Sequence, residues 1–85
     1  MKSIFKYPLE ITDVVDIEMP VGSIVCHVNT QRGKAFIWAE VDTNKPVEQR
    51  RFYVYGTGNP MIERHQIYLG TFFQSAFVWH LYEDA

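Results

Sequence analysis

One stretch predicts both a strand and the turn that ends it: Arg51-Phe52-Tyr53-Val54-Tyr55-Gly56-Thr57-Gly58-Asn59-Pro60. Side chains alternate between the two faces of a strand, so Phe52 and Val54 share one face while Arg51 and both tyrosines share the other. The two glycines can adopt a positive φ, and Pro60 cannot donate a ladder hydrogen bond. The stretch therefore predicts a strand with one core face and one aromatic, cationic face suited to stacking on a flat ligand.

Alternating apolar and polar residues on both sides of this stretch predict further short strands. The predicted strands cover Ser3–Tyr7, Leu9–Met19, Ser23–Asn29, Ala35–Asp42, Arg50–Tyr55, Ile67–Gln74 and Ala76–Tyr82. No apolar stripe at helical spacing is long enough for a helix, and residues 59–66 fit either a loop or one short helical turn. We predict one all-β domain over residues 1–85, a small antiparallel sheet, sandwich or partly open barrel of six or seven strands. Residues 23–55 are predicted to form a three-stranded meander.

A chain of 85 residues has a thin margin of stability, because it buries only about 60–65% of the surface that its unfolded form exposes. Small domains compensate with disulfides, metals or self-association. Cys26 is the only cysteine, so no internal disulfide can form, and we predict a place for it in the core. The three histidines and this cysteine lack zinc-ligand spacing, so neither a metal nor a cofactor is expected. Self-association into a homo-oligomer is therefore the expected means of stabilising the domain.

The charge balance argues against two classes of partner. A net charge of −2 and a pI near 5.8 do not supply the basic field of a generic nucleic-acid binder. No apolar run approaches the roughly 20 residues of a membrane span. The amino terminus lacks the apolar region of a signal peptide, and the thiol is unpaired, so a cytoplasmic location is expected.

No catalytic constellation is recognisable in the sequence. The candidate nucleophiles have no context that would activate them: Ser3, Ser23, Ser75 and Cys26. The Gly56-Thr57-Gly58 segment lacks the lysine and the helix of a phosphate-binding loop, so a turn that needs glycine is favoured over a phosphate contact. Glu40 and Asp42 are interpreted as surface acids rather than a glycosidase pair. We therefore predict a protein that is not an enzyme.

The sequence contains local groups of positively charged residues despite its net negative charge. They occur at Arg50-Arg51, at Arg32 with Lys34, and at Lys6. Each spot alone is typical of a solvated face, but several that converge across a subunit interface would suit a small anion such as a phosphorylated nucleotide. Aromatic residues near arginine hold nucleotide bases without catalysis.

Six short patterns appear in order along the chain: Lys6-Tyr7-Pro8-Leu9, Met19-Pro20-x-Gly22, Trp38-Ala39-x-Val41-Asp42, Tyr55-Gly56-Thr57-Gly58-x-Pro60, Tyr68-x-Gly70-Thr71 and Val78-Trp79-His80. Over nearly the whole chain this set resembles a family of small, uncharacterised phage and prophage proteins. The resemblance implies a counter-defence (anti-defence) setting in the cytoplasm of the host cell. Small non-catalytic phage proteins occupy a host protein or sequester a host signal, and some are homo-oligomeric sponges that bind cyclic nucleotides between subunits.

The first functional hypothesis is therefore a phage-encoded sponge for a cyclic-nucleotide-type defence signal. Its expected ligand-binding residues provide stacking, positive charge and hydrogen bonds: Lys6, Tyr7, Trp38, Arg51, Tyr55, Thr57 and Gly58. Two alternatives stay open. One is a protein–protein inhibitor of a host defence complex, for example a nuclease or an RNA-guided complex (anti-CRISPR-like). The other is a structural protein accessory to the virion.

Overall fold

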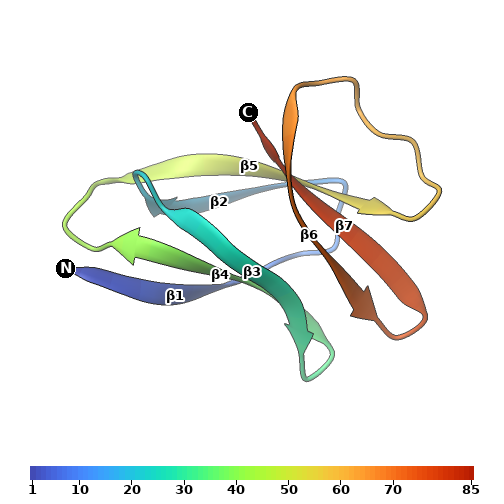
Figure 1. Cartoon of the computed structure of the whole chain (residues 1–85), viewed down its shortest axis with the longest axis horizontal. Helices are drawn as coiled ribbons and strands as arrows, with labels where there is room; N and C mark the ends of the chain where they lie inside the picture. Colours follow the sequence, from blue (N-terminus) through green and yellow to red (C-terminus); the bar gives the residue numbers. More distant parts are fainter.

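The computed structural model describes all residues from 1 to 85 and contains seven β-strands and no helix. The strands are β1 (Lys2–Pro8), β2 (Val14–Pro20), β3 (Ile24–Gln31), β4 (Lys34–Asp42), β5 (Val47–Gly56), β6 (Gln66–Gln74) and β7 (Phe77–Asp84). They form two antiparallel sheets that pack face to face, one in the order β1-β4-β3 and the other in the order β2-β5-β7-β6 (Figure 1). The predicted all-β, sandwich-like fold is confirmed, and residues 59–66 contain no helical turn.

The predicted meander over residues 23–55 is wrong in its last step. β3 and β4 pair as expected, but β5 pairs with β2 and β7 in the other sheet. The reason is competition for the second edge of β4, which the first strand of the chain occupies. With both edges of β4 hydrogen-bonded, β5 has no free ladder to join and crosses to the opposite layer.

The core lies between the two sheets and follows the period-two pattern of the sequence. In β4, alternate residues from Ala35 to Val41 are at most 5% exposed, and Phe52 and Val54 of β5 face them from the other sheet. Full burial of a large apolar side chain contributes roughly 1.5–3 kcal/mol relative to leaving it exposed. The second predicted strand starts later than expected, at Val14. Leu9 therefore lies in the connection between β1 and β2, where it is also buried.

A β-bulge in β3 overturns the prediction that Cys26 lies in the core. The ladder pairs Val25 with Ala39 and His27 with Trp38, so Cys26 has no partner in β4. The extra residue shifts the alternation, because two positions on the bulged strand face one position on its neighbour. The Cys26 side chain is consequently exposed.

The sandwich is closed on one side, where β3 and β6 lie against each other. Gly70 makes this approach possible, because a Cβ at this position would come within 2.8 Å of Val28 Cγ1. The Thr30 hydroxyl donates to the Phe73 carbonyl (3.1 Å), and the Gln74 amide donates to the Gly33 carbonyl (3.1 Å). β1 and β2 form the remaining two edges.

Candidate ligand site

A basic pocket lies on the outer face of the three-stranded sheet, beside the turn between β3 and β4. It encloses about 380 Å³ and is lined by Lys6, Gln31, Arg32, Lys34 and Phe36. The local sequence explains the arrangement, because Arg32 and Gly33 both have positive φ (54° and 77°), as a two-residue type I′ hairpin turn requires. This turn places Arg32 at the tip, with Lys34 on the outer face of β4.

The charges in this pocket are not neutralised within the chain. Lys6 Nζ donates to Gln31 Oε1 (3.0 Å) and lies 4.6 Å from the centroid of the Phe36 ring. No carboxylate lines the pocket, and Lys6, Arg32 and Lys34 form no ion pair. Three cationic groups around one concavity favour an anion.

An apolar groove continues from the basic pocket and shares Lys34 and Phe36 with it. The groove encloses about 360 Å³ and is lined by Pro8, Leu9, Glu10, Ile11, Gly33, Lys34, Ala35, Phe36 and Gln74. A cationic half and an apolar half therefore adjoin along β4. Such a surface matches a ligand with an anionic group and a flat apolar part.

Trp38 extends the aromatic surface along the same face of β4. Its ring lies 6.1 Å from that of Phe36 and 6.0 Å from the imidazole of His27. Lys6 is its direct partner across the β1–β4 ladder. Of the predicted site residues, Lys6 and Trp38 are thus neighbours on one face.

The other predicted site residues lie elsewhere. Tyr7 alternates with Lys6 and packs against the core, and burial raises the pKa of its phenol. The remaining four belong to β5 and the loop that follows it, in the opposite sheet: Arg51, Tyr55, Thr57 and Gly58. Arg51 forms a bidentate ion pair with Asp16 (2.9 and 3.1 Å). Within one chain, the seven residues therefore do not converge on a single site.

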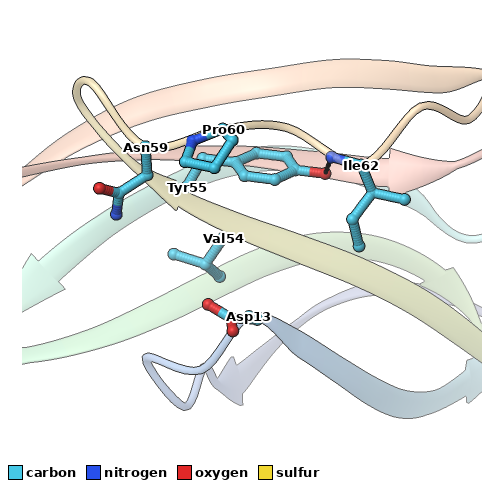
Figure 2. A pocket seen from close by; sticks show the side chains of 6 residues that line it. All are labelled: Asp13, Val54, Tyr55, Asn59, Pro60 and Ile62. Carbon is cyan, nitrogen blue, oxygen red and sulfur yellow. Dashed lines mark hydrogen bonds between the residues drawn. The ribbon is translucent and has the colours of Figure 1, made fainter.

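Figure 2 shows the Tyr55 hydroxyl pointing toward the backbone nitrogen of Ile62. The phenol lies beside a pocket of about 260 Å³, lined by Asp13, Val54, Tyr55, Asn59, Pro60 and Ile62. The Tyr55 hydroxyl donates to Gln66 Oε1 (2.8 Å) and accepts from the Ile62 N–H (3.3 Å). The side chain is only 8% exposed. Tyr55 thus fastens the loop between β5 and β6 to the sheet and offers little surface for stacking.

Thr57 and Gly58 line a second pocket at this loop, of about 270 Å³, together with His80. His80 Nε2 lies 2.8 Å from Thr57 Oγ1, and His80 Nδ1 lies 2.9 Å from Thr71 Oγ1. The Thr71 hydroxyl is in turn 2.6 Å from that of Tyr68. This chain of hydrogen bonds connects β6, β7 and the loop, so the Thr57 hydroxyl already has a partner.

Four residues that line the basic pocket were not among the predicted site residues: Gln31, Arg32, Lys34 and Phe36. Arg32 and Lys34 were visible as a local positive spot beside a glycine turn. What joins them to Lys6 is the pairing of β1 with β4, which brings together residues nearly 30 positions apart. The sequence signal for a two-residue turn at Arg32 and Gly33 could have placed the side chains of Arg32 and Lys34 together at one end of a sheet.

Comparisons with known proteins identify the family. No curated protein and no solved structure matches the sequence. The structure contains no helix long and apolar enough to cross a membrane, and no group of three or more potential ligand side chains that could hold a metal ion. The whole chain, residues 1–85, matches a domain of unknown function, DUF7352, and the protein belongs to this family.

Proposed function

We propose that the protein binds and sequesters a small phosphorylated nucleotide without cleaving it. The observation that carries the proposal is the distribution of positive charge. The chain has eight lysines and arginines, and four of them form ion pairs with carboxylates: Lys2, Arg50, Arg51 and Arg64. Of the four that do not, three line the basic pocket: Lys6, Arg32 and Lys34.

The spacing along β4 suits a nucleotide. Residues in a strand are about 3.4 Å apart, so Lys34 and Phe36 are separated by about 7 Å and Phe36 and Trp38 by the same distance. A phosphate at Lys34 would leave the base beside the Phe36 ring, on the wall shared with the apolar groove. Stacking of a base on an aromatic side chain contributes roughly 1–3 kcal/mol.

Binding rather than turnover is supported by what lines the basic pocket. The groups are cationic side chains, one amide and one aromatic ring, with no carboxylate, imidazole or hydroxyl among them. Cleavage of a phosphodiester requires a positioned base, nucleophile or metal. The lining supplies charge and stacking surface only.

Calorimetric titration with a panel of mononucleotides and cyclic di- and trinucleotides tests the proposal, with the ligand recovered after denaturation and weighed by mass spectrometry. We expect one class to bind and to be recovered intact. Lys34→Ala should weaken binding at least tenfold, because loss of one charge-assisted hydrogen bond costs about 1.5 kcal/mol or more. Lys45→Ala is the matched control, since Lys45 is exposed and lies outside every pocket.

Arg51→Ala separates the basic pocket from the site expected on the opposite sheet. Because Arg51 is paired with Asp16, its removal should leave the affinity for nucleotide unchanged. An Arg51→Ala variant that loses binding, beside a Lys34→Ala variant that retains it, would move the site to the four-stranded sheet. Failure of every nucleotide to bind would remove the proposed function.

We further propose that the sequestered nucleotide is a signal of host defence, as the resemblance to phage proteins implies. Expression of the protein should then restore the growth of a phage on a host whose defence uses a cyclic-nucleotide signal. Lys34→Ala should abolish this protection, and Lys45→Ala should not. Equal protection by both variants would show that the basic pocket is not needed for the phage to grow on this host.

A second candidate function, inhibition of a host protein, has one observation in its favour. Phe73 and Phe77, near the turn between β6 and β7, are 66% and 61% exposed. Exposed aromatic side chains at a protruding hairpin are typical anchors of protein interfaces. A host protein captured by the native chain and by Lys34→Ala, but lost with Phe73→Ser and Phe77→Ser, would favour this candidate over the first.

A further inference from the structure

The free edge of β1 can be deduced from the hydrogen bonds at the two ends of its ladder with β4. The Thr43 N–H donates to the Met1 carbonyl (2.9 Å), and the Leu9 N–H donates to the Ala35 carbonyl (3.0 Å). In an antiparallel ladder, hydrogen-bonded pairs alternate with pairs that are not bonded. The backbone groups of the even-numbered residues of β1 therefore point away from the sheet: Lys2, Ile4 and Lys6.

The free edge of β2, in the other sheet, follows from the hydrogen bonds at the two ends of its ladder with β5. The Val54 N–H donates to the Asp13 carbonyl (3.2 Å), and the Val21 N–H donates to the Pro46 carbonyl (2.8 Å). The residues whose N–H and C=O groups point outward are again the even-numbered ones: Val14, Asp16 and Glu18. In both strands, the residues with free backbone groups also have their side chains on the outer face.

The two free edges are offset from each other. β2 packs against β4 across the core, so β1 extends beyond the second sheet. Figure 1 shows β1 at the lower left of the molecule with no strand behind it. As a result, Phe5 on the inner face of β1 is 40% exposed, whereas Ala39, its partner in the ladder, is fully buried.

We propose that a second copy of this chain covers this side, with β1 of each copy paired to β2 of the other. β1 and β2 run in opposite directions (Figure 1). A two-fold rotation about an axis parallel to the strands preserves strand direction, so β2 of the partner meets β1 antiparallel. The same rotation places β1 of the partner beneath β1, in the space left by the offset. Phe5 then packs against the partner's Phe5.

The charges on the two edges select this pairing over self-pairing. With Ile4 opposite the partner's Asp16, Lys2, which also pairs with Glu40 of its own chain, faces the partner's Glu18, which has no ion pair within its chain. Two β1 edges paired about Ile4 would instead place Lys2 against Lys6, and two β2 edges paired about Asp16 would place that carboxylate against its own copy. Like charges directly opposite each other destabilise a strand pair, and opposite charges stabilise it. Unpaired edges of this kind otherwise expose a template for uncontrolled association.

The dimer contact is isologous and closed, because the two strand pairs form together and use every free edge on this side. Lys6, which lines the basic pocket, lies opposite the partner's Val14 in this register, so the pocket of each copy borders the dimer contact. The inference does not rest on the proposed function, because it uses only the strand edges and Phe5.

Sedimentation equilibrium over a series of concentrations tests the inference, with Ile4→Pro as the diagnostic variant. Proline removes an N–H that points away from β4, so the ladder with β4 stays intact while the contact with the partner loses a donor. We expect a dimer for the native chain and a folded monomer for Ile4→Pro. Ile4→Thr retains the N–H and is the matched control that should stay dimeric. A native monomer at all concentrations, or a dimer unaffected by Ile4→Pro, would overturn the inference.

Reciprocal charge exchange tests the register. Glu18→Lys places a lysine opposite Lys2 of the partner and should weaken the dimer at least tenfold. The double variant Lys2→Glu, Glu18→Lys restores opposite charges across the contact and should recover most of the lost affinity; full recovery is not expected because Lys2→Glu also breaks the exposed Lys2–Glu40 ion pair. A purely structural effect of either substitution would not be rescued by the other, so absence of rescue would reject this register.

Discussion

Removal of Glu83 should destabilise the protein strongly, because this residue pairs with a half-buried arginine. Arg50 on β5 and Glu83 on β7 form a bidentate ion pair, with Nη2 to Oε1 at 2.9 Å and a second bond from Nε to Oε2. Arg50 Nη1 also donates to the Ser23 carbonyl (2.7 Å) in the turn between β2 and β3. The hydrogen bond to Glu83 raises the pKa of the guanidinium. This cluster joins two strands and a turn at one end of the sandwich.

The expected magnitude follows from the exposure of the pair. Removing one partner of a buried ion pair costs about 3–5 kcal/mol, whereas exposed pairs contribute about 0.2–1 kcal/mol. The side chains of Arg50 and Glu83 are 16% and 13% exposed, so the orphaned guanidinium regains some water. We expect Glu83→Ala to lower the free energy of unfolding by about 2–3 kcal/mol. For a domain of this size that corresponds to a fall in Tm of roughly 10–20 °C.

Urea unfolding of Glu83→Ala, Arg50→Ala and the double variant measures the coupling between the two side chains. All samples need the same protein concentration, because self-association adds to the apparent stability. Arg64→Ala is the control, since Arg64 also forms a bidentate pair, with Asp84, but is 53% exposed. Equal losses of unfolding free energy in Glu83→Ala and Arg64→Ala, or additive effects in the double-variant cycle, would refute the argument that burial makes the Arg50–Glu83 pair contribute more to stability.

Three further predictions follow from the contacts. Gly70→Ala should lower stability by about 1–3 kcal/mol, because its Cβ would meet Val28 Cγ1 at 2.8 Å, and Val28→Ala in the same chain should recover part of the loss in urea unfolding. Hydrogen bonds from arginines hold the pKa values of Asp16 and Asp84 below the ordinary 3.8. The two ionised carboxylates therefore contribute to stability above about pH 4, and this contribution is lost as the pH falls below that value. Tm measured against pH should drop in this range, and it should drop less steeply in Asp84→Asn. Cys26 should react with a thiol reagent in the folded protein without a lag, and protection until urea unfolds the chain would contradict its place on the bulge.

The strands could be predicted from the sequence because most of them obey one local rule. Ala35 to Asp42 alternates strictly, and the structure buries the residues that the alternation assigns to the core. The bulge at Cys26 breaks the rule by one residue, and no residue type in β3 signals it. The partition into two sheets was also hidden, since it depends on whether the first strand or β5 occupies the second edge of β4. That competition is decided by contacts distant in sequence.

The candidate site was predictable only in part, for a related reason. Alternation tells on which side of its own strand a residue lies, but a sandwich has two outer faces that look alike in sequence. Lys6 and Trp38, two of the seven residues predicted for one site, do lie next to each other, because their strands pair in one sheet. Arg51 presents the same chemistry on the opposite layer, where a carboxylate from β2 neutralises it. Whether a cation is free to bind a ligand depends on its cross-strand partner, which composition does not reveal.

The arrangement of charge along β4 also limits the size of the anion that the basic pocket would accept. On its outer face the strand passes from Lys34 through two aromatic residues to Glu40 and Asp42. At about 3.4 Å per residue, the free cations give way within roughly 20–27 Å to carboxylates that are already paired, Glu40 with Lys2 and Asp42 with the N-terminal ammonium. A long polyanion extended along this face from the pocket would reach a stretch without an unpaired cation, whereas a mononucleotide or cyclic dinucleotide ends before it. The acidic balance that argues against a generic nucleic-acid binder is therefore compatible with a local site for a small phosphorylated ligand.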